Sequence, residues 1–232
     1  MKIFIGVLAF ASFASSSLDY PRLQIVDRNM YSEGKKNITI AYLLQGFSSQ
    51  EAALTSEVGK WLIKVQKQAE TELTKKLGVP LILETTGIKV PGDELSHLLS
   101  TWISSGQMHA DTVVDYLKTF FRKSFNPDII CLVTKATLYD SRHQKHLGYS
   151  KIYEFVSMVW CQCFYITSIK LRTAGAHLST LIESSISPNK RSRWSKMTKE
   201  EKELYLDGCN IRYKERNKSG FWRISRCSYL QR

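Results

Sequence analysis

The sequence predicts an α/β fold built on a mostly parallel sheet. Three stretches rich in Ile, Leu and Val (37–44, 79–90 and 128–134) are typical of buried strands. Between them lie stretches whose apolar residues recur at helical spacing. Because parallel neighbouring strands need a helical crossover, this alternation of strands and helices favours a parallel sheet.

The first strand and the first helix are predicted from the spacing of their apolar residues. The strand covers 37–44 and is closed by Gln45-Gly46. The helix covers 49–77, with Ser48 or Ser49 as a candidate N-cap and Gly78 just past its end. One face of this helix collects large apolar side chains, namely Leu54, Val58, Trp61, Leu62, Val65 and Leu73.

Turn signals divide the rest of the chain. Pro91-Gly92 closes the second strand, and Asn126-Pro127 stops the helix before the third. In chain order we expect a helix at 93–103, Gly106 as a break, a helix at 111–125, a polar loop at 139–148, a fourth strand at an edge over 151–160, a short continuation over 161–169, a helix at 172–187 and a small helix at 200–205.

The N-terminus has the pattern of a secretory signal peptide. Lys2 precedes a short apolar run, and small residues follow at 14–17. We therefore expect a signal peptide over 1–17, a linker over 18–36 and one domain over 37–232. No later segment approaches the roughly 20 apolar residues of a membrane helix, so we expect no membrane span. With its signal peptide removed, the mature protein is expected to be secreted. We also expect it to be a monomer.

Composition excludes a disordered chain, and charge gathers at one end. Hydrophobic residues make up 43% and aromatic residues 11%, as in globular domains. The formal net charge is +12, and 188–232 alone carries 13 Lys and Arg against 5 Asp and Glu. Such an excess attracts polyanions such as glycosaminoglycans, anionic lipids or nucleic acids, although a solubilising surface is the commoner explanation.

Five cysteines in a secreted chain predict two disulfides and one free thiol. Cys131 lies in an apolar run and is expected to be a buried thiol. The other four, all in the last third, are Cys161, Cys163, Cys209 and Cys227. Two sequons, at Asn37 and Asn217, are compatible with glycosylation.

The most specific motif lies near the C-terminus. The segment 207–213 reads DGCNIRY, and 216–231 reads RNKSGFWRISRCSYLQ. Together they resemble the end of reprolysin-type metzincin proteases, in which a D-G-x-I-M-S-Y-like turn precedes an F-x-x-S-x-C-S segment. Short secreted reprolysin-like proteins of tick saliva are similar in the same region. The resemblance implies a metzincin-like domain, with an upper subdomain over about 37–187 and an irregular, disulfide-tied lower subdomain over about 188–232.

In this family the helix before the tail carries H-E-x-x-H-x-x-G-x-x-H, which holds a catalytic zinc. In a first register, His177 is the first ligand, and Leu178, Leu181, Ser184 and Ser187 take the places of the glutamate, second histidine, glycine and third histidine. A second register aligns the apolar residues better. It puts Ala176, Thr180 and Ile186 at the ligand positions and His177 at the glutamate.

Both registers leave at most one metal ligand and no general base, and a lone histidine does not hold catalytic zinc. Ile211 also replaces the family's turn methionine, and only a short segment stands where active relatives carry an inhibitory propeptide. We therefore predict no zinc cofactor and no protease activity. An active zinc endopeptidase with non-standard ligands, and a decoy or inhibitor that uses the old substrate cleft, are the alternatives.

No other catalytic site is indicated. His143 and His146 lie in a polar loop with Asp140, where a solvent-exposed pair is the commoner outcome, and His97 and His109 are isolated. No Ser-His-Asp spacing, glycine-rich phosphate loop or paired-cysteine zinc ribbon is present in the sequence.

The resemblance also implies a disulfide pattern. The family's cysteine before the zinc helix pairs with one near the chain end, which implies Cys161 or Cys163 with Cys227, and the other of the two with Cys209. Each bond would stabilise the fold by about 3–4 kcal/mol through loop entropy.

We therefore predict a secreted protein that acts by binding an extracellular protein or a sulfated glycan, with no small-molecule cofactor. Trp194 and Trp222 interleave with the basic residues, as apolar anchors or as core residues. The expected binding residues are the basic ones of the tail, namely Lys190, Arg191, Arg193, Lys196, Arg212, Lys214, Arg216 and Lys218.

Overall fold

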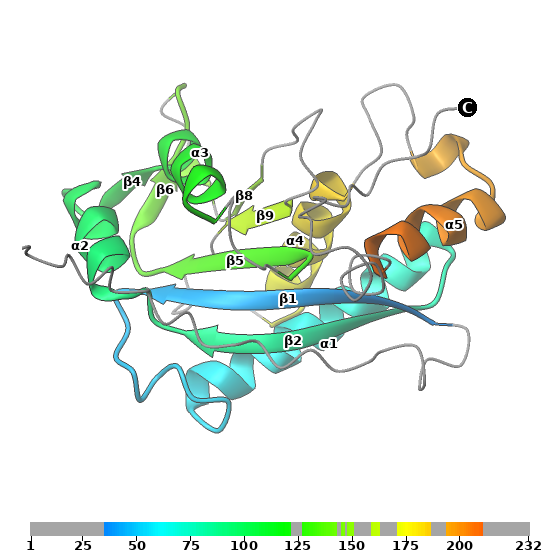
Figure 1. The fold of residues 1–232 in the computed structure, drawn as a ribbon, viewed down its shortest axis with the longest axis horizontal. Coiled ribbons are helices and arrows are strands. Elements are labelled where there is room, and N and C mark those ends of the chain that lie inside the picture. Colours follow the sequence, from blue (N-terminus) through cyan, green and yellow to red (C-terminus); the bar gives the residue numbers. More distant parts are fainter. Residues whose placement is uncertain are drawn as a thin grey trace, which may run out of the picture.

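The computed structural model describes residues 35–121, 127–142, 145–146, 148–150, 159–162, 171–186 and 194–210. They form a mixed α/β fold around a five-stranded sheet of order β2-β1-β5-β9-β8 (Figure 1). The first four strands of that order are mutually parallel, and β8 is antiparallel to β9. The predicted fold class, a mostly parallel sheet with crossover helices, is confirmed at this level.

The three predicted central strands are present. They are β1 (Lys36–Gln45), β2 (Leu81–Lys89) and β5 (Ile129–Thr134). All six residues of β5 are buried, as expected for a strand that is covered on both faces. Asp128, just before β5, ties it to β1, because its Oδ2 accepts from the Thr39 amide at 2.9 Å and the Thr39 hydroxyl at 2.7 Å.

The predicted fourth strand is described only at its end, where it differs from the prediction in its place in the sheet. The described strand is β9 (Val159–Gln162), which overlaps 151–160 only in its first two residues. Among the described strands it is not at an edge, because β8 (Tyr149–Ser150) pairs with it on the side away from β5. The segments 151–158 and 163–169 lie outside the described residues.

Helix α1 (Glu57–Leu77) begins eight residues later than predicted. Ser48 and Glu51 form the reciprocal hydrogen bonds of a capping box, but they close a turn and do not start the helix. The Ser48 amide donates to the Glu51 carboxylate at 2.7 Å, and this bond lowers the pKa of Glu51. The true N-cap is Ser56, whose hydroxyl accepts from the Gly59 amide at 2.9 Å. Gly78 ends the helix in the left-handed conformation, as predicted.

The chain between β2 and β5 holds the predicted helices and a hairpin that was not predicted. The helices are α2 (Asp93–Thr101) and α3 (Ala110–Phe121). Strands β3 (Ile103–Ser104) and β4 (Gln107–His109) pair across Ser105 and Gly106, which both have positive φ. This is the backbone that a two-residue hairpin turn needs.

A second, four-stranded sheet of order β3-β4-β6-β7 includes part of the region expected to be a polar loop. Strand β6 (Thr137–Tyr139) pairs parallel with β4 and antiparallel with β7 (Lys145–His146). These strands are too short to leave a periodic signal in the sequence.

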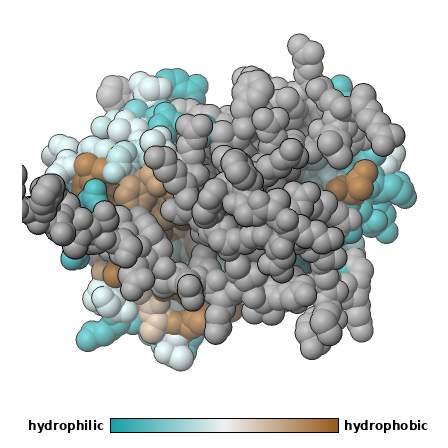
Figure 2. All heavy atoms as spheres, in the orientation of Figure 1, coloured by the Kyte–Doolittle hydropathy of each residue, from teal (hydrophilic) through white to brown (hydrophobic). Residues whose placement is uncertain are grey.

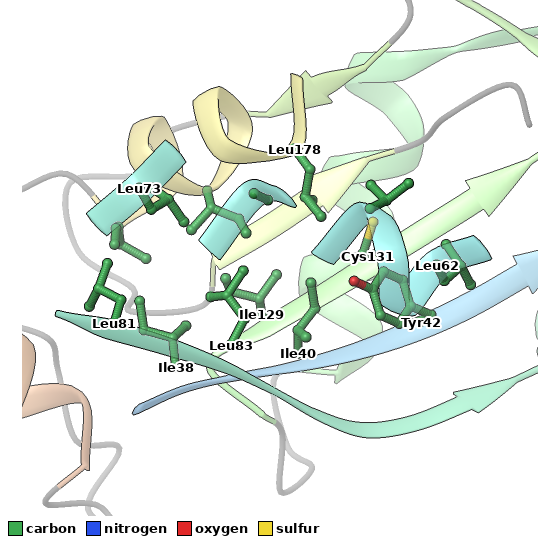
Figure 3. Close-up of a cluster of buried hydrophobic side chains, with 14 of the residues drawn as sticks. Ile38, Ile40, Tyr42, Leu62, Leu73, Leu81, Leu83, Ile129, Cys131 and Leu178 are labelled. Carbon is green, nitrogen blue, oxygen red and sulfur yellow. The ribbon is translucent and has the colours of Figure 1, made fainter. Parts of the chain in front are cut away.

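Two apolar cores lie on opposite faces of the main sheet. The first core packs β1, β2 and β5 against α1 and against α4 (Leu171–Ser185). Figure 3 shows its side chains, with Ile40, Tyr42 and Cys131 from the sheet and Leu62, Leu73 and Leu178 from the helices. The second core lies under α2 and α3. Cys131 is a buried free thiol, as predicted.

The C-terminal elements join the first core. They are the short 3-10 helix η2 (Trp194–Lys196) and helix α5 (Lys199–Asn210), which extends beyond the predicted 200–205. Trp194, Tyr205 and Leu206 are buried in the first core. Figure 2 shows mostly hydrophilic described side chains over these outer elements and apolar atoms over the segment between β1 and α1, where Leu54 is 56% exposed. None of the described helices is long and apolar enough to cross a membrane.

Candidate functional site

Helix α4 is the element on which the sequence places the candidate site. It runs beside α1 and against β9 (Figure 1). Its core-facing side is formed by Ala174, Leu178 and Ile182, all 0% exposed, and Leu181 is half-buried against the same core. The apolar spacing that predicted a buried face is confirmed.

The solvent side of α4 carries the only histidine of the helix. Thr173, Ala176, His177 and Thr180 are exposed. Positions 176 and 180 are one turn apart, which is the spacing of the two helix-borne ligands in a zinc motif. Thr180 instead bonds to its surroundings: its hydroxyl donates to the Ala176 carbonyl at 3.0 Å and accepts from Lys76 Nζ at 3.1 Å.

Burial distinguishes the two registers that the sequence left open. The first would put the general base at Leu178, which is 0% exposed in the apolar core. A glutamate there could not reach a metal-bound water on the solvent side. The second puts Ala176, His177 and Thr180 on the exposed side and Leu178 in the core. The geometry therefore favours the second register.

The donor set of α4 does not fit a catalytic zinc. In the second register the helix offers a methyl group and a threonine hydroxyl at the ligand positions, and Ile186, at the third, is 2% exposed and apolar. Catalytic zinc takes three His, Glu, Asp or Cys ligands. Within the described residues there is also no group of three or more such side chains that could hold a metal ion.

Tyr149 anchors β8 to α3 near the outer end of the main sheet. Its hydroxyl donates to Asp111 Oδ1 at 2.6 Å. Burial raises the pKa of Tyr149 well above its ordinary value, and the hydrogen bond and charge of Asp111 add to the shift, as do the charges of Asp140 and Asp115. The phenol is therefore held neutral as a hydrogen-bond donor, which is a positioning contact.

The other predicted histidines do not form a site in the described residues. His97 is exposed on α2. His109 is half-buried, with Nδ1 2.8 Å from the Thr112 hydroxyl and its ring against Tyr139. Asp140 is 4% exposed and pairs with Arg142 at 3.3 Å. His143 and the side chain of His146 lie outside the described residues.

The predicted binding residues are only partly described. Lys196 is exposed in η2. Trp194 is 7% exposed and packs edge-to-face against Tyr205. Its indole N–H donates to the Glu183 carbonyl at 3.3 Å, so Trp194 is a core residue in this structure. The residues outside the described part are Lys190, Arg191, Arg193, Arg212, Lys214, Arg216, Lys218 and Trp222.

The predicted modification sites have the following places. Cys161, in β9, is the strand-register partner of Cys131, and Cys209 lies in the last turn of α5. Cys163, Cys227 and Asn217 lie outside the described residues. Asn37 lies in β1, and its sequon threonine, Thr39, is fully buried with its hydroxyl bonded to Asp128.

Similarity of this chain to known proteins is found among solved structures. No protein-family model and no curated protein matches this sequence. Among solved structures, the chain is similar to archaemetzincin from Methanopyrus kandleri, with 11% sequence identity, a TM-score of 0.42, and coverage of 72% of this chain and 83% of that one.

Proposed function

We propose that this protein is a secreted, catalytically inactive relative of reprolysin-type metzincin proteases, and that it acts by binding an extracellular partner. One observation carries the proposal. The exposed side of α4 presents Ala176, His177 and Thr180, where a metzincin helix would present a histidine, a glutamate and a second histidine.

Two further features support a metzincin ancestry. Helix α4 keeps the core residues of such a helix, with Leu178 buried and Leu181 half-buried against the first core. The tail motifs at 207–213 and 216–231 resemble the segments that follow that helix in the family. A chain that keeps the packing residues and has none of the reacting ones is suited to a binding role.

The catalytic part of the proposal is tested by metal analysis of the purified, secreted protein. We expect far less than one zinc per chain by inductively coupled plasma mass spectrometry, and no chelator-sensitive cleavage of denatured protein substrates. His177→Ala is the matched variant, since it removes the only histidine of α4 from an exposed position.

The result that would sink the proposal is also specific. About one zinc per chain, lost in His177→Ala together with chelator-sensitive cleavage, would establish an active enzyme with non-standard ligands. Zinc that is retained in His177→Ala without any cleavage would point to a metal site outside α4 and would leave the inactive helix in place.

A further inference from the structure

The solvent face of α1 carries a line of lysines that the proposed function has not used. Lys60, Lys64, Lys67 and Lys75 are exposed, with exposed Thr71 between the last two. Their spacing of four, three and eight residues keeps them on one side of the helix. At 1.5 Å per residue the line is about 22 Å long. We call these four side chains the α1 lysine row.

Local carboxylates neutralise the α1 lysine row only in part. Lys60 pairs with Glu57 at 3.5 Å, and both side chains are largely exposed, so this pair exchanges easily with another anion. Lys67 contacts Glu70, whose side chain is only 12% exposed and whose other oxygen accepts from the Leu83 amide. Lys64 and Lys75 have no carboxylate partner among the described residues.

The row leads toward the basic tail. Lys76, next to Lys75, bonds to Glu183 Oε2 on α4 at 3.2 Å. The carbonyl of Glu183 accepts from the indole of Trp194, which places η2 against this end of the two helices. Lys196, two residues further, is exposed. Among the described residues, positive charge thus runs from the end of α1 to Lys196 in η2.

We propose that the α1 lysine row binds a linear sulfated polysaccharide, which deepens the proposed binding function and rests on its secreted location. A straight row of flexible ammonium groups suits a linear chain of sulfates, which needs charge and little fixed geometry. The face lacks the features of other polyanion sites. The only aromatic residue of α1, Trp61, is half-buried against the first core, so it offers no platform for bases.

An anionic membrane suits this face less well. A membrane-binding helix needs a broad apolar face beside its lysines. The apolar face of α1 packs inside the protein, where Leu62, Val65 and Leu73 are at most 1% exposed. Ile63, which is 38% exposed, is the one exposed large apolar residue of the helix.

The test uses the full secreted chain and a heparin oligosaccharide of defined length as the probe. The double variant Lys64→Gln/Lys75→Gln removes the two unpaired lysines of the row. The control Lys118→Gln/Lys135→Gln removes the same formal charge from α3, on the opposite face of the sheet, and from the residue after β5, where Lys135 pairs with Glu51 at 3.5 Å. Circular dichroism establishes that both variants are folded.

We expect the row variant to bind heparin about tenfold more weakly, with a shallower dependence of affinity on salt, and the control to stay within about twofold of the native protein. Heparin should also bind about tenfold more tightly than single-stranded DNA at equal charge concentration, because the row has no aromatic platform for bases. Equal losses in both double variants, tighter binding of DNA, or tighter binding of anionic vesicles would overturn the inference.

A third variant separates this inference from the proposed function. Lys190→Gln/Arg191→Gln/Arg193→Gln/Lys196→Gln removes the first four of the eight predicted binding residues of the tail and leaves the α1 lysine row intact. If only this variant loses heparin binding, the row is not the site, although a binding role through the tail would stand. The zinc and cleavage measurements are independent of both outcomes.

Discussion

His177 and Leu178 are neighbours in sequence with opposite environments. His177 is exposed, and Leu178 is 0% exposed in the first core. A carboxylate at position 178 would be desolvated without a partner, whereas one at 177 would stay in water. We expect Leu178→Glu to lower the free energy of unfolding by more than about 4 kcal/mol and His177→Glu to change it by less than about 0.5 kcal/mol, measured by urea denaturation.

The control for this pair is Leu178→Met, which keeps the volume and apolarity of the side chain and should cost less than about 1.5 kcal/mol. If Glu were tolerated equally well at 177 and 178, the preference for the second register would be wrong, and Leu178 would again be a candidate for the residue that stands at the family's glutamate position.

The raised pKa of Tyr149 makes the stability of the folded protein depend on pH in the alkaline range. Its pKa in the folded protein is raised by burial and by Asp111, so the folded state favours the neutral phenol. This stabilisation is fully present below the ordinary tyrosine pKa of about 10 and is lost as the pH rises toward the higher folded value.

We expect the free energy of unfolding to fall more steeply above about pH 10 in the native protein than in Tyr149→Phe, which has no proton to lose. Denaturant titrations at several pH values between about 8 and 11 would measure the two slopes. Parallel curves would show that Tyr149 does not titrate differently in the folded and unfolded states.

At the scale of elements, the packing of α4 on α1 depends on Gly175. A Cβ at this position would lie 2.4 Å from Gln68 Cγ and 2.5 Å from Gln68 Cβ. In an exposed helix, Gly→Ala usually stabilises by about 1 kcal/mol. Here we expect the opposite sign, with Gly175→Ala lowering the free energy of unfolding by about 1–3 kcal/mol because the helices must separate.

The neighbouring exposed position gives the control. Ala176→Gly makes the reverse change at a site that contacts solvent and should cost about 1 kcal/mol from helix propensity alone. The double variant Gly175→Ala/Gln68→Gly, compared with Gln68→Gly alone, tests the contact itself, because only glycine at 68 removes both the Cγ and the Cβ that a methyl group at 175 would meet. Recovery smaller than about 0.5 kcal/mol would show that Gln68 is not what excludes the methyl group.

Strand β2 is an edge of the main sheet, and α1 covers part of its backbone. The Leu81 amide donates to Thr74, the Leu83 amide donates to Glu70, and the Leu83 carbonyl accepts from Gln66 Nε2 at 2.7 Å. Gln66 is 6% exposed, and its Oε1 accepts from Tyr42 and Thr85. These three hydrogen bonds of a buried amide fix the register between α1 and the edge strand.

Removing that amide should be costly. Gln66→Ala removes the side-chain donor to the buried Leu83 carbonyl and the acceptor of the Tyr42 hydroxyl, so we expect a loss of about 3 kcal/mol in urea denaturation. Gln68→Ala removes a half-buried amide with a single hydrogen bond, to Glu72, and should cost less than about 1 kcal/mol. Similar losses in the two variants would mean that the network contributes nothing beyond helix packing.

The elements that the sequence predicted well are those with a long periodic signal. Strands β1, β2 and β5, and helices α1 and α4, each bury a continuous apolar face. The β3–β4 hairpin was missed because its strands have two and three residues, and only the Ser105-Gly106 dipeptide marks its turn. The start of α1 was misplaced because Ser48 and Glu51 satisfy each other in a turn.

The sequence predicted which helix carries the candidate site, but not which of its side chains face solvent. Spacing alone placed His177 on a helix with an apolar face, yet it allowed two alignments to a zinc motif. Choosing between the two alignments requires knowing which side of α4 is buried. Part of α4 is covered by α1, which is about a hundred residues away in sequence. Local periodicity cannot supply that long-range contact.

At the scale of the whole molecule, the described C-terminal elements belong to the same core as the sheet. Trp194 and Leu206 are buried in the first core with Leu73 and Leu178. The Lys202 ammonium donates to the Leu77 carbonyl at the end of α1 at 3.1 Å. Because these contacts cross from 194–206 to the N-terminal half, η2 and α5 should unfold together with the sheet.

Trp194 tests this cooperativity and decides between an anchor for a partner and a core residue. Trp194→Ala removes a side chain that is 7% exposed and that packs against Tyr205 with ring centroids 5.4 Å apart. We expect a loss of about 3–5 kcal/mol, seen as one transition shifted to lower denaturant for both far-UV and near-UV signals. Leu204→Ala, on the same helix as Tyr205 but 65% exposed, should cost less than about 0.5 kcal/mol. If Trp194→Ala instead produced a separate early transition and left the main one unmoved, the C-terminal elements would be an independent unit docked on the sheet.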